Sequence, residues 1–368
     1  ILSWRIPAAT PPVMISTTVE TGANMWAMIR KEFRQVRRDR RTLGLMIAMP
    51  VMLLVVFGYA ASFDVSEIPA IVYGPEAEAA AGFLPEVFSI EEIDPEGTEA
   101  DAVSRLRRGG IVVAFVTSGP EALVDGSQLF AARAAVQILT SGQGPGLDYE
   151  VLFNPELDTS AILIPGLAGL ILLFIGTLLT SLGVVRERQA GTLEQLAVMP
   201  LRARDVFIGK VAPYFLVAAF DLAVVLAVGS FLFDVPFNGN PLVLVLGAFI
   251  FLFVTLGFGV LVSTVSENQG QAVQLALITL LPQILLSGII FPLSSMAPGV
   301  RWIGYLLPLT YFNQIAQGVM LRGATFGDLL RPFGLLTVLA IVVFGLAVLR
   351  FRRDLAAGER RRVAAHAH

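Results

Sequence analysis

The sequence contains no cysteine and only two histidines among its 368 residues. Without cysteine, the chain cannot form a disulfide, a thiolate metal site or a cysteine nucleophile. Both histidines, His366 and His368, lie in segment 350–368, which is rich in arginine and which we expect to form a basic, disordered tail. A catalytic or metal site based on histidine is therefore not expected.

Charged residues are also scarce, at 15% of the chain, whereas hydrophobic residues make up 55% and the mean hydropathy is +0.74. A soluble domain carries about 25% charged residues, so this composition predicts a chain whose solvent is largely lipid. Residues 1–24 are polar and contain no apolar core of a signal peptide, and we expect them to form a disordered leader.

Long apolar runs dominate the rest of the chain. A helix needs roughly 20 mostly apolar residues to cross the hydrocarbon core of a bilayer, and six stretches are long enough. They are Thr42–Phe63, Ala161–Val185, Val211–Phe233, Pro241–Ser263, Gln271–Phe291 and Pro332–Leu349. The expected fold is an α-helical polytopic membrane protein with six transmembrane helices, the last five forming a bundle over 161–349.

Arginine and lysine gather before the first span, between the second and third spans, and after the sixth span. Segment 64–160, between the first two spans, is acidic by contrast. Because basic residues stay on the cytoplasmic side, we expect both termini to be cytoplasmic and segment 64–160 to be extracytoplasmic.

Segment 64–160 reads as a small α/β domain rather than a disordered loop. Short β-rich runs alternate with stretches of helical spacing, and turn residues separate them. The predicted strands are Ile68–Tyr73, Ile111–Thr117 and Leu147–Phe153, and the predicted helices are Glu76–Pro85, Thr98–Arg108 and Gln128–Leu139. Ala102, Val103 and Leu106 would face the sheet. The many acidic residues are expected to form a solvated surface rather than a cation or substrate site.

The sequence has no P-loop. The only similar fragment, Gly209–Lys210, is followed by Val211 and has no glycine at the required position upstream. An intramembrane enzyme would need a nucleophile and base or a metal set at membrane depth, and the spans contain neither cysteine nor histidine. No feature indicates a nucleic-acid partner.

Segment 25–41, MWAMIRKEFRQVRRDRR, is strongly amphipathic. Its apolar residues recur at helical spacing, while the other faces are mostly basic. We expect a cytoplasmic helix in the membrane interface, with lipid contacts from Trp26, Lys31, Arg34 and Arg38. The helix either anchors the chain only or also transmits motion to the first span.

The loop after the second span carries a short predicted helix, Thr192–Met199, between Gly191 and Pro200. Leu193, Leu196 and Ala197 share one face of it. Such a helix with charged residues on both sides is suited to docking into a groove on a soluble partner, the alternative being an ordinary surface loop.

Four stretches in the expected order resemble the permease subunits of type-2 ABC exporters. They are KEFRQVRRDRRTLGLMIAMP, NPELDTSAILIPG, RERQAGTLEQLAVMP and SGIIFPLSSMAPGVRWIGYLLPLTYF, and the resemblance runs over about Met25–Arg353. It implies a coupling helix at 190–200 that docks on a separate ABC ATPase. The implied coupling residues are Glu187, Gly191, Thr192, Leu193, Glu194, Leu196 and Pro200.

The resemblance also implies that segment 25–41 is the family's connecting helix and that segment 292–321 forms two re-entrant helices at the outward end. Phe291–Pro292 and Pro308 would break the fifth span there. A working transporter would contain two ATPase subunits, which bind ATP and Mg, and a second permease copy or a paralogue. No cofactor is expected on this chain, and its expected location is the bacterial inner membrane.

Asp221 lies about halfway along the third span, where an ionised carboxylate is costly. It either faces the translocation path or forms a structural polar pair with Gln274, Gln283 or Asn313. Polar residues in otherwise apolar spans are the candidates for the path: Asp221, Thr177, Thr180, Gln274, Gln283 and Asn313. The alternative is that such residues bind helices to one another.

The leading hypothesis is an ATP-driven export permease for a small hydrophobic or amphipathic compound such as a drug or lipid. Export of a lipid-linked glycan is an alternative, which the large inserted domain at 64–160 disfavours. A third hypothesis is a mechanical transducer or sensor that couples to an ATPase while nothing crosses the bilayer.

Overall fold

The computed structural model describes most of the chain after residue 66. The described residues are 67–119, 122–141, 148–191, 203–233, 235–290, 293 and 296–366, with Arg30, Arg34, Gly44, Leu45, Pro50 and Val51; side chains are described except at 203–211, 298 and 351–366. The chain divides into two units, Ile1–Ala48 and Met49–His368, and the elements below belong to the second. Most of the predicted interfacial helix and first span therefore lies outside the described residues.

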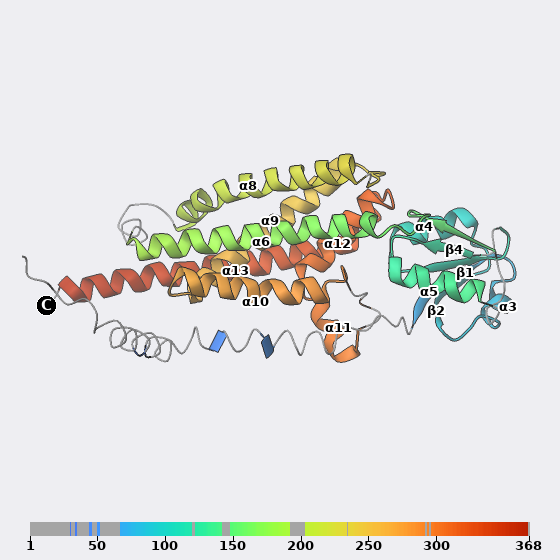
Figure 1. The fold of residues 1–368 in the computed structure, drawn as a ribbon, viewed down its shortest axis with the longest axis horizontal. Helices are drawn as coiled ribbons and strands as arrows, with labels where there is room; N and C mark the ends of the chain where they lie inside the picture. Colours follow the sequence, from blue (N-terminus) through green and yellow to red (C-terminus); the bar gives the residue numbers. More distant parts are fainter. Residues whose placement is uncertain are drawn as a thin grey trace, which may run out of the picture. The chain divides into compact units, whose positions relative to one another are not determined.

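A five-stranded sheet with three helices follows residue 67. Its elements are β1 (Ile68–Tyr73), α3 (Ala77–Ala81), β2 (Phe88–Asp94), α4 (Glu99–Arg107), β3 (Val113–Val116), β4 (Ala122–Asp125), α5 (Leu129–Thr140) and β5 (Tyr149–Leu152). The strand order is β2-β1-β3-β4-β5. All neighbours pair in parallel except β3 and β4, which are antiparallel. This α/β domain confirms the predicted fold class of the inserted segment (Figure 1).

The sheet is covered on both faces because successive side chains of a strand point to opposite sides. On one face, Ile71 and Tyr73 of β1 pack with Ala102 and Leu106 of α4, as the helical spacing predicts. On the other face, Ile68, Ala70 and Val72 belong to the cluster that α3 and α5 complete. Helix α4 begins with a capping box, in which Thr98 and Asp101 satisfy each other's backbone N–H groups.

The two strands β2 and β4 were not predicted. β2 has the sequence FSIEEID and forms one edge of the sheet, with exposed or half-exposed side chains at all but its first position. An acidic, mostly exposed strand carries little of the alternation that identifies strands. β4 has only four residues, ALVD, all buried, which is too short a pattern to separate from a turn.

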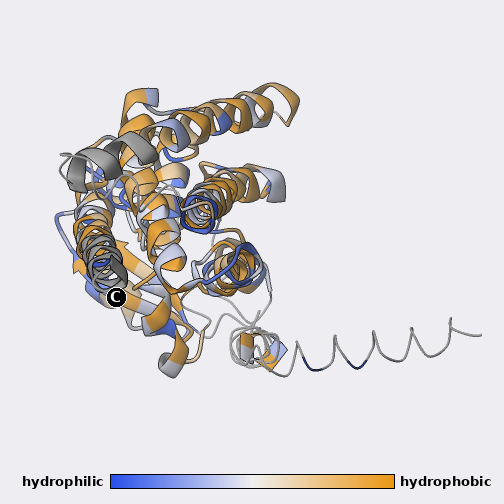
Figure 2. Ribbon diagram, turned by 90° about the vertical axis from the view of Figure 1, so that its left-hand side faces the viewer, coloured by the Kyte–Doolittle hydropathy of each residue, from blue (hydrophilic) through white to orange (hydrophobic). Residues whose placement is uncertain are grey.

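Among the described residues, five helices are long and apolar enough to cross a membrane. They are α6 (Thr159–Gln189), α8 (Ala203–Leu232), α9 (Pro241–Val265), α10 (Gln269–Leu286) and α13 (Leu330–His366), and two shorter helices are α11 (Pro298–Gly304) and α12 (Pro308–Met320). The five long helices correspond to the predicted second to sixth spans, with different ends. Figure 2 shows that they are hydrophobic along most of their length.

Helix α12 is enclosed by the longer helices, and all but one of its residues are buried. It packs against α6, α9 and α13. The ring of Phe312 stacks on that of Phe251 in α9, with centroids 4.6 Å apart. Helices α11 and α12 both have proline at the first turn, where its missing N–H costs nothing.

Helices α6 and α9 approach closely along a seam of small residues, which we call the α6–α9 seam. A Cβ atom at Gly176 would lie 2.5 Å from Thr255 Oγ1, and one at Gly259 would lie 2.6 Å from Thr180 Cβ. Thr177 Oγ1 also donates a hydrogen bond of 3.2 Å to the carbonyl of Thr255. Small residues that let helix backbones approach are typical of helix packing in lipid.

Two helix ends differ from the predictions. Helix α10 ends at Leu286 instead of continuing to Phe291, because Gly288 adopts φ +87° and turns the chain. Helix α13 continues without interruption from the sixth span to His366, so a disordered tail is wrong for residues 350–366. Their sequence, rich in arginine and alanine, favours helix even without an apolar stripe.

Candidate functional site

The path residues predicted from the sequence lie on four helices and do not form one cluster. Thr177 and Thr180 lie on α6, within the α6–α9 seam. Thr177 is fully engaged with the α9 backbone, and Thr180 packs on Gly259 with its hydroxyl making no hydrogen bond. Their buried positions between two packed helices fit the alternative that they join helices.

Gln283 and Asn313 lie near the contact of α10, α12 and α6. Gln283 Oε1 accepts a hydrogen bond of 3.3 Å from the backbone N–H of Leu309, one of the N–H groups that the first turn of α12 leaves unpaired. Asn313 is 4% exposed, and its Oδ1 makes no hydrogen bond. A Cβ atom at Gly166 of α6 would lie 3.2 Å from that oxygen. Asn313 is therefore one of three path candidates with an unused buried oxygen, the others being Thr180 and Gln274.

Asp221 is half-buried on α8, between Tyr214 and Gly229, two points at which α8 approaches α6 closely. At one point Tyr214 lies over Gly183, and at the other Gly229 lies over Ile164. Asp221 makes no hydrogen bond with Gln274, Gln283 or Asn313, so the structural pair that we considered is absent from this part of the bundle. Gln274 is half-buried on α10, and its Oε1 makes no hydrogen bond.

The C-terminal end of α6 is fastened to the end of α9, and we call this the coupling end. Arg188 Nη1 donates hydrogen bonds of 2.9 Å and 3.1 Å to the carbonyls of Ser263 and Ser266. The α6 helix then stops at Gly191, which adopts φ +72°. Glu187 is half-buried nearby. The remaining predicted coupling residues, Thr192, Leu193, Glu194, Leu196 and Pro200, lie outside the described residues, as do Trp26, Lys31 and Arg38 of the predicted interfacial helix.

At the opposite end of the bundle, Arg322 follows α12 and is 6% exposed. Its guanidinium donates to the Arg107 carbonyl at 3.1 Å, to Ser127 Oγ at 3.0 Å and to the Gln314 carbonyl at 3.3 Å. The first two acceptors belong to the α/β domain and the third to α12. The sequence analysis missed this residue, because a single arginine after a helix carries no local signal of burial.

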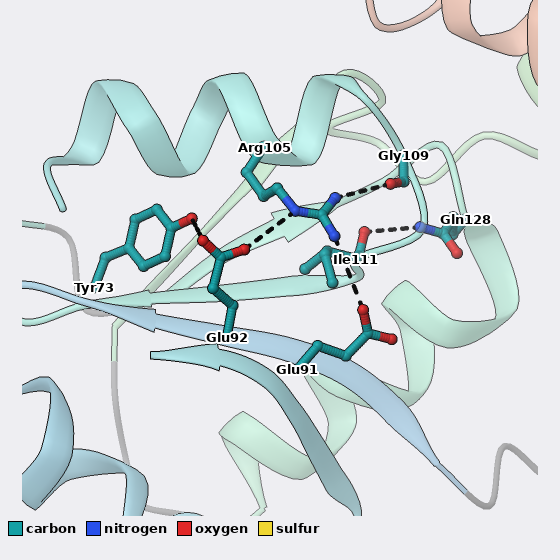
Figure 3. A network of polar contacts seen from close by, with 7 residues as sticks. All are labelled: Tyr73, Glu91, Glu92, Arg105, Gly109, Ile111 and Gln128. Atoms are coloured by element: carbon teal, nitrogen blue, oxygen red, sulfur yellow. Dashed lines mark hydrogen bonds and ion pairs between the residues drawn. The ribbon is translucent and has the colours of Figure 1, made fainter. Parts of the chain in front are cut away.

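Two acidic residues of β2, Glu91 and Glu92, interact with side chains of the neighbouring elements. Figure 3 shows Arg105 of α4 between Glu91 and Glu92 of β2, while the Tyr73 hydroxyl donates to Glu92 at 2.9 Å. Burial, together with the Glu92 carboxylate, raises the pKa of Tyr73 to about 12. Among the described residues, no group of three or more metal-ligating side chains comes together. This network ties β2 to α4 and offers no reactive group.

The family comparison accounts for both the helices and the inserted domain. The family model described as "ABC-2 family transporter protein" matches residues 40–349. The chain is 29% identical to the "Probable multidrug ABC transporter permease YbhS" of Escherichia coli K12, over 90% of this chain and 98% of that protein. It is 27% identical to the "Probable multidrug ABC transporter permease YbhR" of the same strain, over 89% of this chain and 98% of that protein.

A third relative covers less of the chain. The "Inner membrane transport permease YhhJ" of Escherichia coli K12 is 32% identical over 57% of this chain and 56% of that protein. No solved structure matches the chain significantly. With a family match that spans the bundle and the α/β domain, this multi-pass membrane protein belongs to the ABC-2 family of transporter proteins and is a membrane subunit of an ABC transporter.

Proposed function

We propose that the chain is the permease of an exporter that moves a hydrophobic or amphipathic compound outward across a bacterial inner membrane. ATP would be hydrolysed by separate ABC ATPase subunits, since the sequence has no P-loop. The names of the two relatives that cover nine-tenths of the chain, both multidrug permeases, support a compound of this class. Both termini would be cytoplasmic, as the placement of arginine and lysine indicates.

The observation that carries this proposal is the tie made by Arg188 at the coupling end. The predicted docking segment 190–200 follows α6 directly, so a force on that segment acts on the end of α6 first. Because Arg188 holds the last carbonyls of α9, the same force reaches the second central helix of the bundle. ATP binding could then shift the bundle between two states to the extent that ATP binds one of them more tightly.

The transporter would contain a second permease, either another copy of this chain or a paralogue. Two different permeases of one Escherichia coli strain are both similar to this chain over most of its length, which is compatible with pairing of paralogues. Within each permease we place Asn313 foremost among the three path residues with an unused buried oxygen, because it is more buried than Gln274 and, unlike Thr180, lies outside the α6–α9 seam. Asp221 and Gln274 are the half-buried candidates on the neighbouring helices.

The proposal is tested by reconstituting the chain with its cognate ATPase in lipid vesicles whose ATPase side faces outward. An amphipathic fluorescent dye and a fluorescently labelled phospholipid serve as probes. Uptake that needs ATP, together with ATP hydrolysis stimulated by the same probe, is the expected result. In the variant Arg188→Ala, we expect hydrolysis to continue while uptake falls.

Arg186→Ala is the matched control, since Arg186 lies half a turn away on the same helix and is exposed. It should transport like the parent chain. Hydrolysis without movement of either probe would contradict export of such compounds and favour the transducer. Movement of a lipid-linked oligosaccharide alone would favour the glycan exporter. Equal loss in the two arginine variants would contradict the role given to Arg188.

A further inference from the structure

Arg322 is the most buried cation among the described residues whose burial is resolved, and the fold must compensate for it. A buried charge is costly unless it is hydrogen-bonded and faces an opposite charge. All three nitrogen atoms of the guanidinium donate: Nε to the Arg107 carbonyl, Nη1 to Ser127 Oγ and Nη2 to the Gln314 carbonyl. One planar group therefore joins the end of α4, the loop after β4 and helix α12.

The opposite charge is Asp125, which is completely buried at the end of β4. Its Oδ1 accepts from the backbone N–H of Ser127 at 2.9 Å, and Ser127 in turn accepts from Arg322. Its Oδ2 accepts from Gln128 Nε2 at 3.2 Å, and the same nitrogen donates to the Ile111 carbonyl (Figure 3). Burial raises the pKa of the Asp125 carboxyl, and the charge of Arg322 acts in the opposite direction. Asp125 and Arg322 thus stabilise each other through Ser127.

Space for the guanidinium is left by one glycine on each side. A Cβ atom at Gly109 of the α/β domain would lie 3.1 Å from Arg322 Nη2, and one at Gly318 of α12 would lie 3.2 Å from the same atom. Any larger residue at either position would press on the guanidinium. The site is therefore shaped for arginine from both sides.

A second pair of opposite charges lies in the same junction. Asp328, in the loop after Arg322, accepts two hydrogen bonds from Thr325, at 3.0 Å and 2.7 Å. Although burial acts against it, these bonds and the charges of Arg108 and Arg107 hold the pKa of Asp328 below its usual range. The bundle thus presents both a cation and an anion to the α/β domain.

We propose that Arg322 is a positioning residue for transport, which locks the α/β domain to α12 so that the two move as one body during the transport cycle. Because α12 is buried among α6, α9 and α13, a movement of these helices would also move a domain that is locked to α12. The lock itself rests on geometry alone, whereas its consequence for transport rests on the proposed function.

The lock is tested by a distance measurement that does not depend on transport. The natural chain has no cysteine, so two introduced cysteines can be spin-labelled without removing any residue. Exposed positions on the two sides are Ala100 of α4 and Gly327 of the loop before α13. In the reconstituted complex, we expect one narrow distance distribution that is the same without nucleotide and with ATP under non-hydrolysing conditions.

Arg322→Met should broaden or shift this distribution, whereas Arg105→Met should leave it unchanged. Arg105 is the matched control because its ion pairs, and its hydrogen bond to the Gly109 carbonyl, stay within the α/β domain and do not reach the bundle. Arg322→Lys keeps the charge, but its ammonium group cannot reach three acceptors from one plane, so its distance distribution should have an intermediate width. This variant tests the lock if Arg322→Met does not fold. A nucleotide-dependent distance in the parent chain, or a narrow distribution in the folded Arg322 variants, overturns the proposal.

Transport by the same vesicles supplies the functional readout. We expect Arg322→Met to reduce uptake of the amphipathic dye by about tenfold while basal ATP hydrolysis persists, with Arg105→Met close to the parent chain. Equal uptake by the two variants overturns the positioning role. Failure of the parent chain to move any probe overturns the proposed function instead, and in that event the distance measurement still decides whether the lock exists.

Discussion

The two ends of the helical bundle are both tied by an arginine, yet the two ties are of different kinds. At the coupling end, Arg188 is half-buried and donates to two backbone carbonyls of the last turn of α9 and the residue after it. At the opposite end, Arg322 is 6% exposed and is surrounded by three acceptors and a buried carboxylate.

The difference lies in what replaces each tie when it breaks. Ser263 and Ser266 are themselves buried, but Arg188 is half-exposed, so water can enter the space that it leaves and hydrate their carbonyls at modest cost. When Arg322 leaves its site, its guanidinium loses three acceptors. Asp125 keeps its hydrogen bonds from Ser127 and Gln128 but loses the neighbouring cation in a buried environment, which costs far more. We infer that the coupling end can deform during a cycle, while the junction with the α/β domain moves as one piece.

The sharpest way to break this comparison is to remove one charge from the buried pair. Arg322→Met removes three hydrogen bonds and the cation that faces the buried Asp125, and we expect the free energy of unfolding to fall by about 3–5 kcal/mol. Thermal unfolding of the purified chain in detergent measures this loss as a lower melting temperature.

The double variant Arg322→Met with Asp125→Asn provides the control, because it removes both charges together. It should be more stable than Arg322→Met alone, since no uncompensated charge remains. Strictly additive losses in the two single variants would show that the charges do not interact and would contradict the pairing of Asp125 with Arg322.

The α6–α9 seam connects the two ends, and Gly259 offers a way to open it. Gly259→Leu places side-chain atoms where Thr180 already lies, so we expect the helices to separate and stability to fall by about 1–3 kcal/mol. Gly334→Leu is the matched control, because nothing lies within 4 Å of a Cβ atom there. Melting temperatures of the two variants should differ clearly, and similar values would argue against a close seam.

Much of this architecture could be predicted because its signals are local. A run of some 20 apolar residues identifies a span without knowledge of its neighbours, and the five described long helices correspond to the predicted second to sixth spans. Strand β1 has the predicted bounds because it is apolar throughout and ends at a glycine turn. The end of α10 was missed because Gly288, rather than the more conspicuous Pro292, turns the chain.

The junction at Arg322 could not be predicted, because its parts are far apart in the sequence. Arg322 and Ser127 are separated by 195 residues, and neither lies in a recognisable motif. In the sequence, Asp125 does not differ from the other acidic residues of this segment, and only the folded sheet shows that it is buried. The path candidates show the converse, since polarity singled out Thr177 but only the packing shows that its hydroxyl is used by α9.

A smaller effect is expected from removing the tie at the coupling end. Arg188→Ala removes the charge-assisted hydrogen bonds to Ser263 and Ser266 and leaves a space that opens toward solvent, so we expect a loss of about 1–2 kcal/mol. Arg186→Ala, on the exposed side of the same turn, should change the melting temperature little. A loss as large as that of Arg322→Met would contradict the view that the coupling end is the more easily deformed of the two.

The smallest effect concerns Asp158, the N-cap of α6, which stands near the Arg322 junction but is exposed to solvent like the coupling end. Its carboxylate accepts from the backbone N–H of Ser160 at 3.2 Å, and hydrogen bonds from Ser160 lower the pKa of Asp158. Because the pKa of Asp158 is lower in the folded state, the ionised cap stabilises the fold at pH values above the pKa of the unfolded state, about 3.9. This contribution disappears as the pH falls through the pKa of the folded state.

Melting temperatures of the parent chain and of Asp158→Ala should therefore differ slightly at neutral pH and converge in acid. Asp158→Asn separates the charge from the cap, because asparagine also accepts from the first turn but does not titrate in this range. The melting temperature of Asp158→Asn should be close to that of the parent chain at neutral pH. It should not show the decrease in acid that protonation of Asp158 causes in the parent chain. A gap between parent and Asp158→Ala that persists below the folded pKa would show that the carboxylate acts through packing, and the exposed cap would then resemble the Arg322 junction more than the coupling end.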